Sequence, residues 1–101
     1  MSYNMSFRKR YTINDEHIMW LFILEKLDER DRMAYYPKGL KLWEEFLDTG
    51  NIDGGFTVQS LSTHFRKYMY HHIEKSSLTV EQQVKIAAAL RISVSLRQQK
   101  M

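Results

Sequence analysis

The stretch that decides the fold is FTVQSLSTHFRKYM, residues 56–69. Its apolar residues recur at spacings of three and four, so they share one face of a helix. That inward face consists of Val58, Leu61, Phe65 and either Tyr68 or Met69. Thr57 is suited to cap the helix, because its hydroxyl can accept a hydrogen bond from a free backbone N–H of the first turn. The pattern predicts a helix over residues 57–73 with one face in a core.

The opposite face of this helix is polar and contains no carboxylate. Its residues can all donate hydrogen bonds, and they are Gln59, Ser62, Thr63, Arg66, Lys67 and Tyr70. Between Asp53 and Glu74 there is no acidic residue, whereas two cations and three histidines occur there. An ordinary solvated helix face usually mixes charges of both signs. A stretch without acids favours contact with a polyanion over that ordinary explanation.

Two more helices are expected before this one. Thr12 is a good N-cap for a helix over residues 13–27, and Asp15 and Glu16 suit its first turn, where the helix dipole favours negative charge. A shorter helix follows Pro37, and its turns end at the glycine-rich run DTGNIDGG, residues 48–55. Its inward residues are expected to be Leu40, Trp43, Phe46 and Leu47, with Trp43 central to the core.

A fourth helix is expected after Thr79, which forms a capping box with Gln82. Its inward residues are expected to be Val80, Val84, Ala87 and Ala88. The whole pattern predicts an all-α fold, in which a three-helix core carries an additional C-terminal helix. Residues 11–101 form one helical domain, and residues 1–10 form a flexible basic N-terminal arm.

Composition excludes several classes of protein. The 101 residues include no cysteine, which excludes disulfides, thiol nucleophiles and cysteine-bound zinc. The longest apolar stretch, residues 18–24, is too short to span a bilayer, so no membrane association is expected. No phosphate loop or nucleophile motif occurs, so we expect no enzyme, no cofactor and no metal site. The histidines His64, His71 and His72 are expected at the surface or facing phosphates.

The predicted helices and the basic arm together match the arrangement of a helix-turn-helix DNA-binding domain. In that arrangement the third helix occupies the major groove and the arm reaches the adjacent minor groove. Arg66 suits a bidentate contact to guanine, and Gln59 a similar contact to adenine. The predicted base contacts are Gln59, Ser62, Thr63 and Arg66. The predicted backbone or minor-groove contacts are Arg8, Lys9, Arg10, Lys67, Tyr70 and His71.

Three strings also carry a resemblance: RYTINDEHI (10–18), GLKLWEEF (39–46) and FTVQSLSTHFRKYM (56–69). Together they resemble the Myb-like, homeodomain-like domain of repressor-activator telomere proteins. The resemblance implies that Trp43 and Phe65 are core aromatic residues and that Gln59, Ser62, Thr63 and Arg66 face bases. LTVEQQVKIAAAL (78–90), followed by ISVSL, is similar to the end of the SPK domain.

The two resemblances together point to nematode double-strand telomere-binding proteins. They imply a telomeric repeat as the double-stranded DNA bound, and a location in the nucleus on the chromosome at the telomere. Other telomere proteins, or tandem domains of the same chain, are the implied partners.

Two alternatives remain open. A Myb-like or SPK-like fold can instead serve as a protein–protein interaction module without DNA binding, using the acidic surface of the first two helices together with the extra C-terminal helix. The tyrosine pairs at 35–36 and at 68 and 70 can also stack on bases of single-stranded nucleic acid. Helical spacing favours Tyr68 as a core residue.

Overall fold

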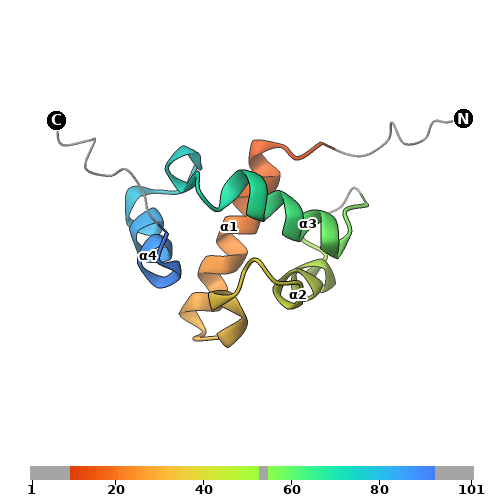
Figure 1. Ribbon diagram of the computed structural model, residues 1–101, viewed down its shortest axis with the longest axis horizontal. Helices are drawn as coiled ribbons and strands as arrows, with labels where there is room; N and C mark the ends of the chain where they lie inside the picture. The colour runs from red at the N-terminus through yellow and green to blue at the C-terminus, as the bar shows by residue number, and fades with distance from the viewer. Residues whose placement is uncertain (1–9, 53–54, 93–101) are drawn as a thin grey trace, which may run out of the picture.

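The computed structural model describes residues 10–52 and 55–92, and this part of the chain is helical without strands (Figure 1). The all-α prediction is therefore confirmed. No helix within these residues is long and apolar enough to cross a membrane. The elements in chain order are α1 (Ile13–Asp28), η2 (Arg32–Tyr35), α2 (Lys41–Thr49), α3 (Val58–His64), η3 (Phe65–Met69), η4 (Ile73–Lys75) and α4 (Val80–Leu90).

Three threonines fix the starts of the helices, as predicted. Thr12 accepts a hydrogen bond from the Asp15 N–H at 3.0 Å, and the Asp15 carboxylate accepts one from the Thr12 N–H. Thr57 accepts from the Ser60 N–H at 3.0 Å. Thr79 and Gln82 form the predicted capping box before α4. Each cap uses residues three apart, so local sequence is enough to specify it.

The core lies where α1, α2 and the α3–η3 segment meet. Trp43 is fully buried, as predicted, and its indole N–H donates a hydrogen bond to the Pro37 carbonyl at 2.7 Å. The Phe65 ring lies 5.5 Å from the Trp43 ring and 5.2 Å from the Trp20 ring, between centroids. In Figure 1, α4 lies on one side of α1, and α2 and α3 lie on the other. Phe65 thus ties η3 to both preceding helices.

The short helix α2 begins later than expected, since Pro37 lies in the turn before it. Leu40 is 44% exposed, so its expected inward position is wrong, and Leu42 is buried instead. At the other end the helix stops at Gly50, whose φ of 73° is left-handed and suits glycine. The glycine-rich end of this helix is as predicted.

The expected inward face of α4 is mostly wrong. Val80 and Val84 are exposed, by 65% and 45%, and Ala88 is also exposed. The buried side chains are those of Ile86 and Leu90, together with Ala87. The exposed valines and the buried Ile86 and Leu90 each have helical spacing. The stripe that packs against α1 is the one with the larger side chains, which bury more apolar surface.

The third helix is interrupted by a π turn. The Tyr70 N–H donates to the Phe65 carbonyl at 2.8 Å, five residues back, so the helix ends near residue 70 instead of at Ile73. The buried residues Leu61, Phe65, Met69 and Ile73 stand four apart. An α-helix has about 3.6 residues per turn, so repeated steps of four drift around it. The extra residue in the π turn offsets this drift, which buries Met69 and leaves Tyr68 exposed.

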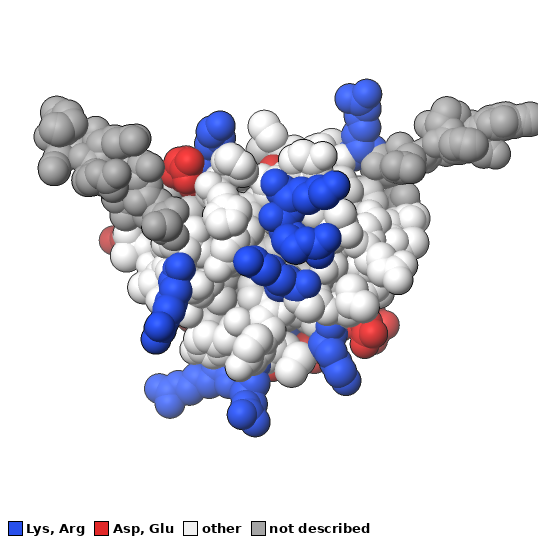
Figure 2. All heavy atoms as spheres, viewed as in Figure 1, with Lys and Arg blue, Asp and Glu red and all other residues white. Residues whose placement is uncertain are grey.

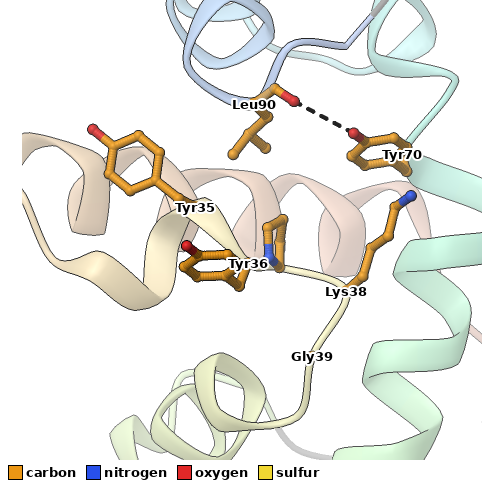
Figure 3. A pocket seen from close by; sticks show the side chains of 7 residues that line it. Tyr35, Tyr36, Lys38, Gly39, Tyr70 and Leu90 are labelled. Carbon is orange, nitrogen blue, oxygen red and sulfur yellow. Dashed lines mark hydrogen bonds between the residues drawn. The ribbon is translucent and has the colours of Figure 1, made fainter.

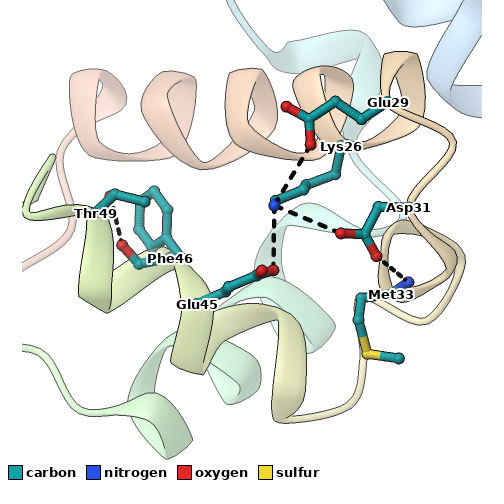
Figure 4. Close-up of polar contacts among 7 residues, drawn as sticks. All are labelled: Lys26, Glu29, Asp31, Met33, Glu45, Phe46 and Thr49. Atoms are coloured by element: carbon teal, nitrogen blue, oxygen red, sulfur yellow. Dashed lines mark hydrogen bonds and ion pairs between the residues drawn. The ribbon is translucent and has the colours of Figure 1, made fainter.

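One lysine holds three segments together (Figure 4). The Lys26 ammonium lies 3.6 Å from the Glu29 carboxylate, 3.5 Å from Asp31 and 3.3 Å from Glu45. These contacts join α1 to the turn before η2 and to α2. Partial burial acts to lower the pKa of Lys26, but the hydrogen bond and charge of Glu45, with the charges of Glu29 and Asp31, outweigh it. The pKa of Lys26 therefore lies above its ordinary value.

We expect this lysine to make the fold sensitive to alkali. A raised folded-state pKa gives stabilisation that is complete below the unfolded value and is lost as pH rises through the folded value. Urea unfolding should therefore show a falling free energy of unfolding above about pH 10.5. Lys26→Met should lower stability at pH 8 and flatten this fall, whereas Lys41→Met, at an exposed lysine, should do neither. An equally steep fall in Lys26→Met would contradict the assignment.

Candidate nucleic-acid interface

The outer face of the α3–η3 segment is exposed and basic. Gln59, Arg66 and Lys67 are exposed, and Thr63 is half-buried on the same face. Figure 2 shows Lys and Arg side chains gathered over the middle of the face on which this segment lies in front, while Asp and Glu atoms appear toward the edges. We call Gln59, Thr63, Arg66 and Lys67 the α3 basic face.

The cations of the α3 basic face are available to a ligand. Within residues 10–52 and 55–92, the side chains that lie within ion-pair distance of a carboxylate are those of Lys26, His64 and Lys85, and neither Arg66 nor Lys67 does so. When no internal carboxylate accepts hydrogen bonds from a cationic side chain, its N–H groups can donate to an incoming anion. The guanidinium of Arg66 can therefore form the planar, two-bond contact that guanine or phosphate accepts.

Ser62 is a correction to the predicted base contacts. Its side chain is only 2% exposed, and its hydroxyl donates to the Lys38 carbonyl at 3.0 Å. This bond anchors α3 to the turn that precedes α2, so the hydroxyl is not available to a base. Ser62 stands four residues after Val58 and three before Phe65, so helical spacing already places it beside the inward face, and its assignment to the polar face is wrong. The turn 24 residues earlier supplies the partner for its hydroxyl.

Tyr70 also differs from the expected free phosphate contact. It is half-buried, and its hydroxyl donates to the Leu90 carbonyl at 3.4 Å. The Lys38 ammonium lies 4.0 Å from the centre of the Tyr70 ring, a distance typical of a cation–π contact. Lys38 therefore joins the basic surface at the end of η3. Nothing in the sequence signals this, because the two residues meet only through the fold.

The chain enters α1 beside the α3 basic face. Tyr11 is stacked between Phe56, at 4.2 Å between ring centroids, and His64, at 3.7 Å, and its hydroxyl is hydrogen-bonded to Ser60. Burial of this ring raises the pKa of Tyr11. Arg10 is exposed next to it. A shallow hollow of about 340 Å³ lies between the two segments, lined by Arg10, Tyr11, Ser60, Thr63, His64, Lys67 and Tyr68.

The stacked Tyr11 brings the last residue of the basic arm, Arg10, to the third helix. Arg10 and Lys67 line the same hollow, so these two predicted backbone or minor-groove contacts lie on one surface. The other two predicted contacts of the arm, Arg8 and Lys9, lie outside the described residues, as does the rest of the predicted arm.

The histidines fall into two kinds. His64 is a correction, since its side chain is 14% exposed and its Nε2 lies 2.7 Å from a Glu16 carboxylate oxygen. It holds α1 against α3 and is mostly covered. His71 and His72 are exposed, as expected. In the described part of the chain, no cluster of three or more His, Asp or Glu side chains is placed to hold a metal ion.

Comparison of this chain with protein-family models, with curated proteins and with solved structures finds no match. The likeness to Myb-like telomere proteins therefore rests on residues 10–18, 39–46 and 56–69 alone, and the likeness to the SPK domain on residues 78–90 and 92–96.

Proposed function

We propose that this domain binds double-stranded DNA, with the α3–η3 segment in the major groove and the basic arm toward the adjacent minor groove. The observation that carries the proposal is the α3 basic face, where the cations Arg66 and Lys67 are exposed with no carboxylate partner in the described chain. DNA presents phosphates along each strand, and such a surface can approach them without like-charge repulsion.

The residues of the α3 basic face divide into two roles. Arg66 and Gln59 are suited to two-bond contacts with base edges, because their side chains present paired hydrogen-bonding groups. Thr63 can add a hydroxyl or a methyl contact. Lys67, with Lys38 and the exposed His71, is placed to contact phosphates, which fix orientation more than sequence. An α-helix with side chains is about 10–12 Å across and fits a major groove about 12 Å wide.

The proposed target is a telomeric repeat in the nucleus, on the chromosome end. The support for this target is the likeness of residues 10–18, 39–46 and 56–69 to telomere-binding Myb-like domains. A single domain with three base-contacting side chains makes few specific contacts. Useful selectivity then calls for a tandem domain or another telomere protein, because linked modules bind with a raised effective concentration.

Selection from a random duplex library tests the proposal. The domain should enrich one short sequence, and telomeric repeats added as competitor should reduce that enrichment more than a shuffled duplex does. Arg66→Ala should relax the preference at one base position, at a cost of roughly 1–3 kcal/mol of binding free energy. Lys67→Ala should weaken all duplexes alike and leave the preference unchanged. Failure to enrich any sequence would contradict sequence-selective binding.

A protein-interaction module is the second candidate function. The observation that favours it is the exposed apolar stripe on α4, where Val80 is 65% and Val84 45% exposed. Apolar side chains exposed in a row often mark a surface that another protein covers. Binding through this stripe should depend little on salt, whereas duplex binding through the α3 basic face should weaken steeply with salt.

A further inference from the structure

A pocket of about 430 Å³ lies where Tyr70, the residue after η3, meets Lys38 and the end of η2 (Figure 3). Figure 3 shows Tyr35 and Tyr36 on one side, Tyr70 and Lys38 on the other, and Leu90 above them. Three separate segments therefore build it: the end of η2 with its following turn, the residue after η3, and the last residue of α4. The volume lies in the range of pockets that hold small ligands.

The walls of this pocket are aromatic and well exposed. Tyr36 is 68% exposed and Tyr35 48%, so both tyrosines offer part of their surface to a ligand. Leu90 and Pro37, which also line the pocket, are buried. Flat, exposed rings beside buried apolar residues suit a flat ligand, because a ring of the ligand that stacks on a tyrosine ring buries one face of each.

A single cation gives the pocket its charge. The Lys38 ammonium lies against the Tyr70 ring, and the described residues place no carboxylate within ion-pair distance of it. The Lys38 carbonyl is held by Ser62 and the Tyr70 hydroxyl by Leu90, so the backbone of Lys38 is fixed to α3 and the ring beneath its ammonium to α4. A ligand with a flat ring next to an anionic group would match both the exposed tyrosine rings and the Lys38 ammonium.

We propose that this pocket binds one unpaired nucleotide, whose base stacks on Tyr36 and whose phosphate pairs with Lys38. The choice of a DNA strand as the source rests on the proposed function, because Lys38 and Tyr70 border the α3 basic face. A strand leaving the duplex at a single-stranded extension can place its first unpaired nucleotide there. An acidic peptide with an aromatic side chain is less well matched. Its several carboxylates would need more than the one cation that lines the pocket.

The test compares four labelled DNAs by fluorescence anisotropy: a blunt duplex, the same duplex with four unpaired thymidines on one strand, the same duplex with them on the other strand, and the single strand alone. The quantity measured is the ratio of the affinities for the extended and the blunt duplex. In the parent, one of the two extensions should raise affinity about fivefold to a hundredfold, the range expected for stacking one base on an aromatic ring. Tyr36→Ala should bring the ratio to one, and Tyr36→Phe should keep it.

Two controls separate the pocket from the duplex-binding surface. Tyr68→Ala removes a tyrosine that is 60% exposed outside the pocket, and it should leave the ratio unchanged. Arg66→Ala should weaken both duplexes equally and also leave the ratio unchanged. Lys38→Gln should lower the ratio by a smaller factor than Tyr36→Ala, because it keeps the stacking surface.

The outcomes distinguish this inference from the proposed function. A ratio of one for both extensions in the parent, or a ratio that Tyr36→Ala does not change, overturns the inference even if blunt duplex binds. Binding of the single strand that depends on Tyr36, without binding of blunt duplex, supports the pocket and overturns the proposed function. Displacement of the extension by thymidine monophosphate supports a nucleotide site open to free ligand. Binding of a Glu-Tyr-Glu peptide, with a ratio of one, assigns the pocket to a protein partner and overturns the inference.

Discussion

Exchanging Arg66 and Lys67 together for glutamate should abolish duplex binding and leave the fold intact. Both side chains are exposed and have no ion-pair partner in the described chain, so their change breaks no ion pair there. Each lost contact to a base or phosphate weakens binding by roughly 1–3 kcal/mol, and the new carboxylates add repulsion from the phosphates. Affinity should fall at least about a hundredfold, while the urea midpoint changes little.

The matched control reverses two other exposed cations, Arg32 and Lys41, which lie at η2 and α2 beside acidic residues. This double variant changes the net charge by the same amount, so a general effect of charge would weaken both variants equally. We expect the Arg32→Glu and Lys41→Glu protein to keep most of its duplex affinity. Equal losses in the two proteins would show that overall charge, and not the α3 basic face, determines binding.

Replacing Phe65 by alanine should have the largest effect on stability. The ring is fully buried and contacts the rings of Trp20, Trp43 and Tyr70, so its loss leaves a cavity where α1, α2 and η3 meet. Truncation of a buried phenylalanine costs roughly 3–5 kcal/mol, against about 5–15 kcal/mol for the whole fold of a small domain. Much of the stability of this domain should therefore disappear.

Urea unfolding followed by tryptophan fluorescence measures this loss directly, because both tryptophans lie within 5.5 Å of the Phe65 ring. Phe65→Leu should lose less, since it keeps part of the volume. Arg66→Ala, one residue along but exposed, should change the free energy of unfolding by less than about 0.5 kcal/mol. A loss below about 1 kcal/mol for Phe65→Ala would contradict the central position of this ring.

Features set by neighbours in the chain could be predicted from the sequence. The caps at Thr12, Thr57 and Thr79 each depend on a residue three positions away, and all three are present. Trp43 could be placed in the core because its large apolar side chain shares one helical face with Phe46 and Leu47, and such a face is usually buried. The exposure of Gln59, Arg66 and Lys67 followed from the same periodicity.

Features set by distant contacts could not be predicted. Periodicity cannot show that the Ser62 hydroxyl bonds to a carbonyl in a turn 24 residues earlier, or that Lys38 meets Tyr70. On α4 it detects two apolar stripes but not which one α1 covers, so Val80 and Val84 were assigned to the core and lie at the surface. The π turn after His64 also depends on packing, because it keeps Met69 and Ile73 in the core.

The salt dependence of binding to a blunt duplex tests the central claim most directly. Each phosphate contact made by a Lys or Arg releases counterions, so the logarithm of the affinity falls with the logarithm of salt with a slope of about −0.9 per contact. Contacts from Lys38, Lys67 and Arg10 alone predict a slope of about −3. A slope near zero, or no binding to any duplex at low salt, would contradict the assignment of the α3 basic face to DNA.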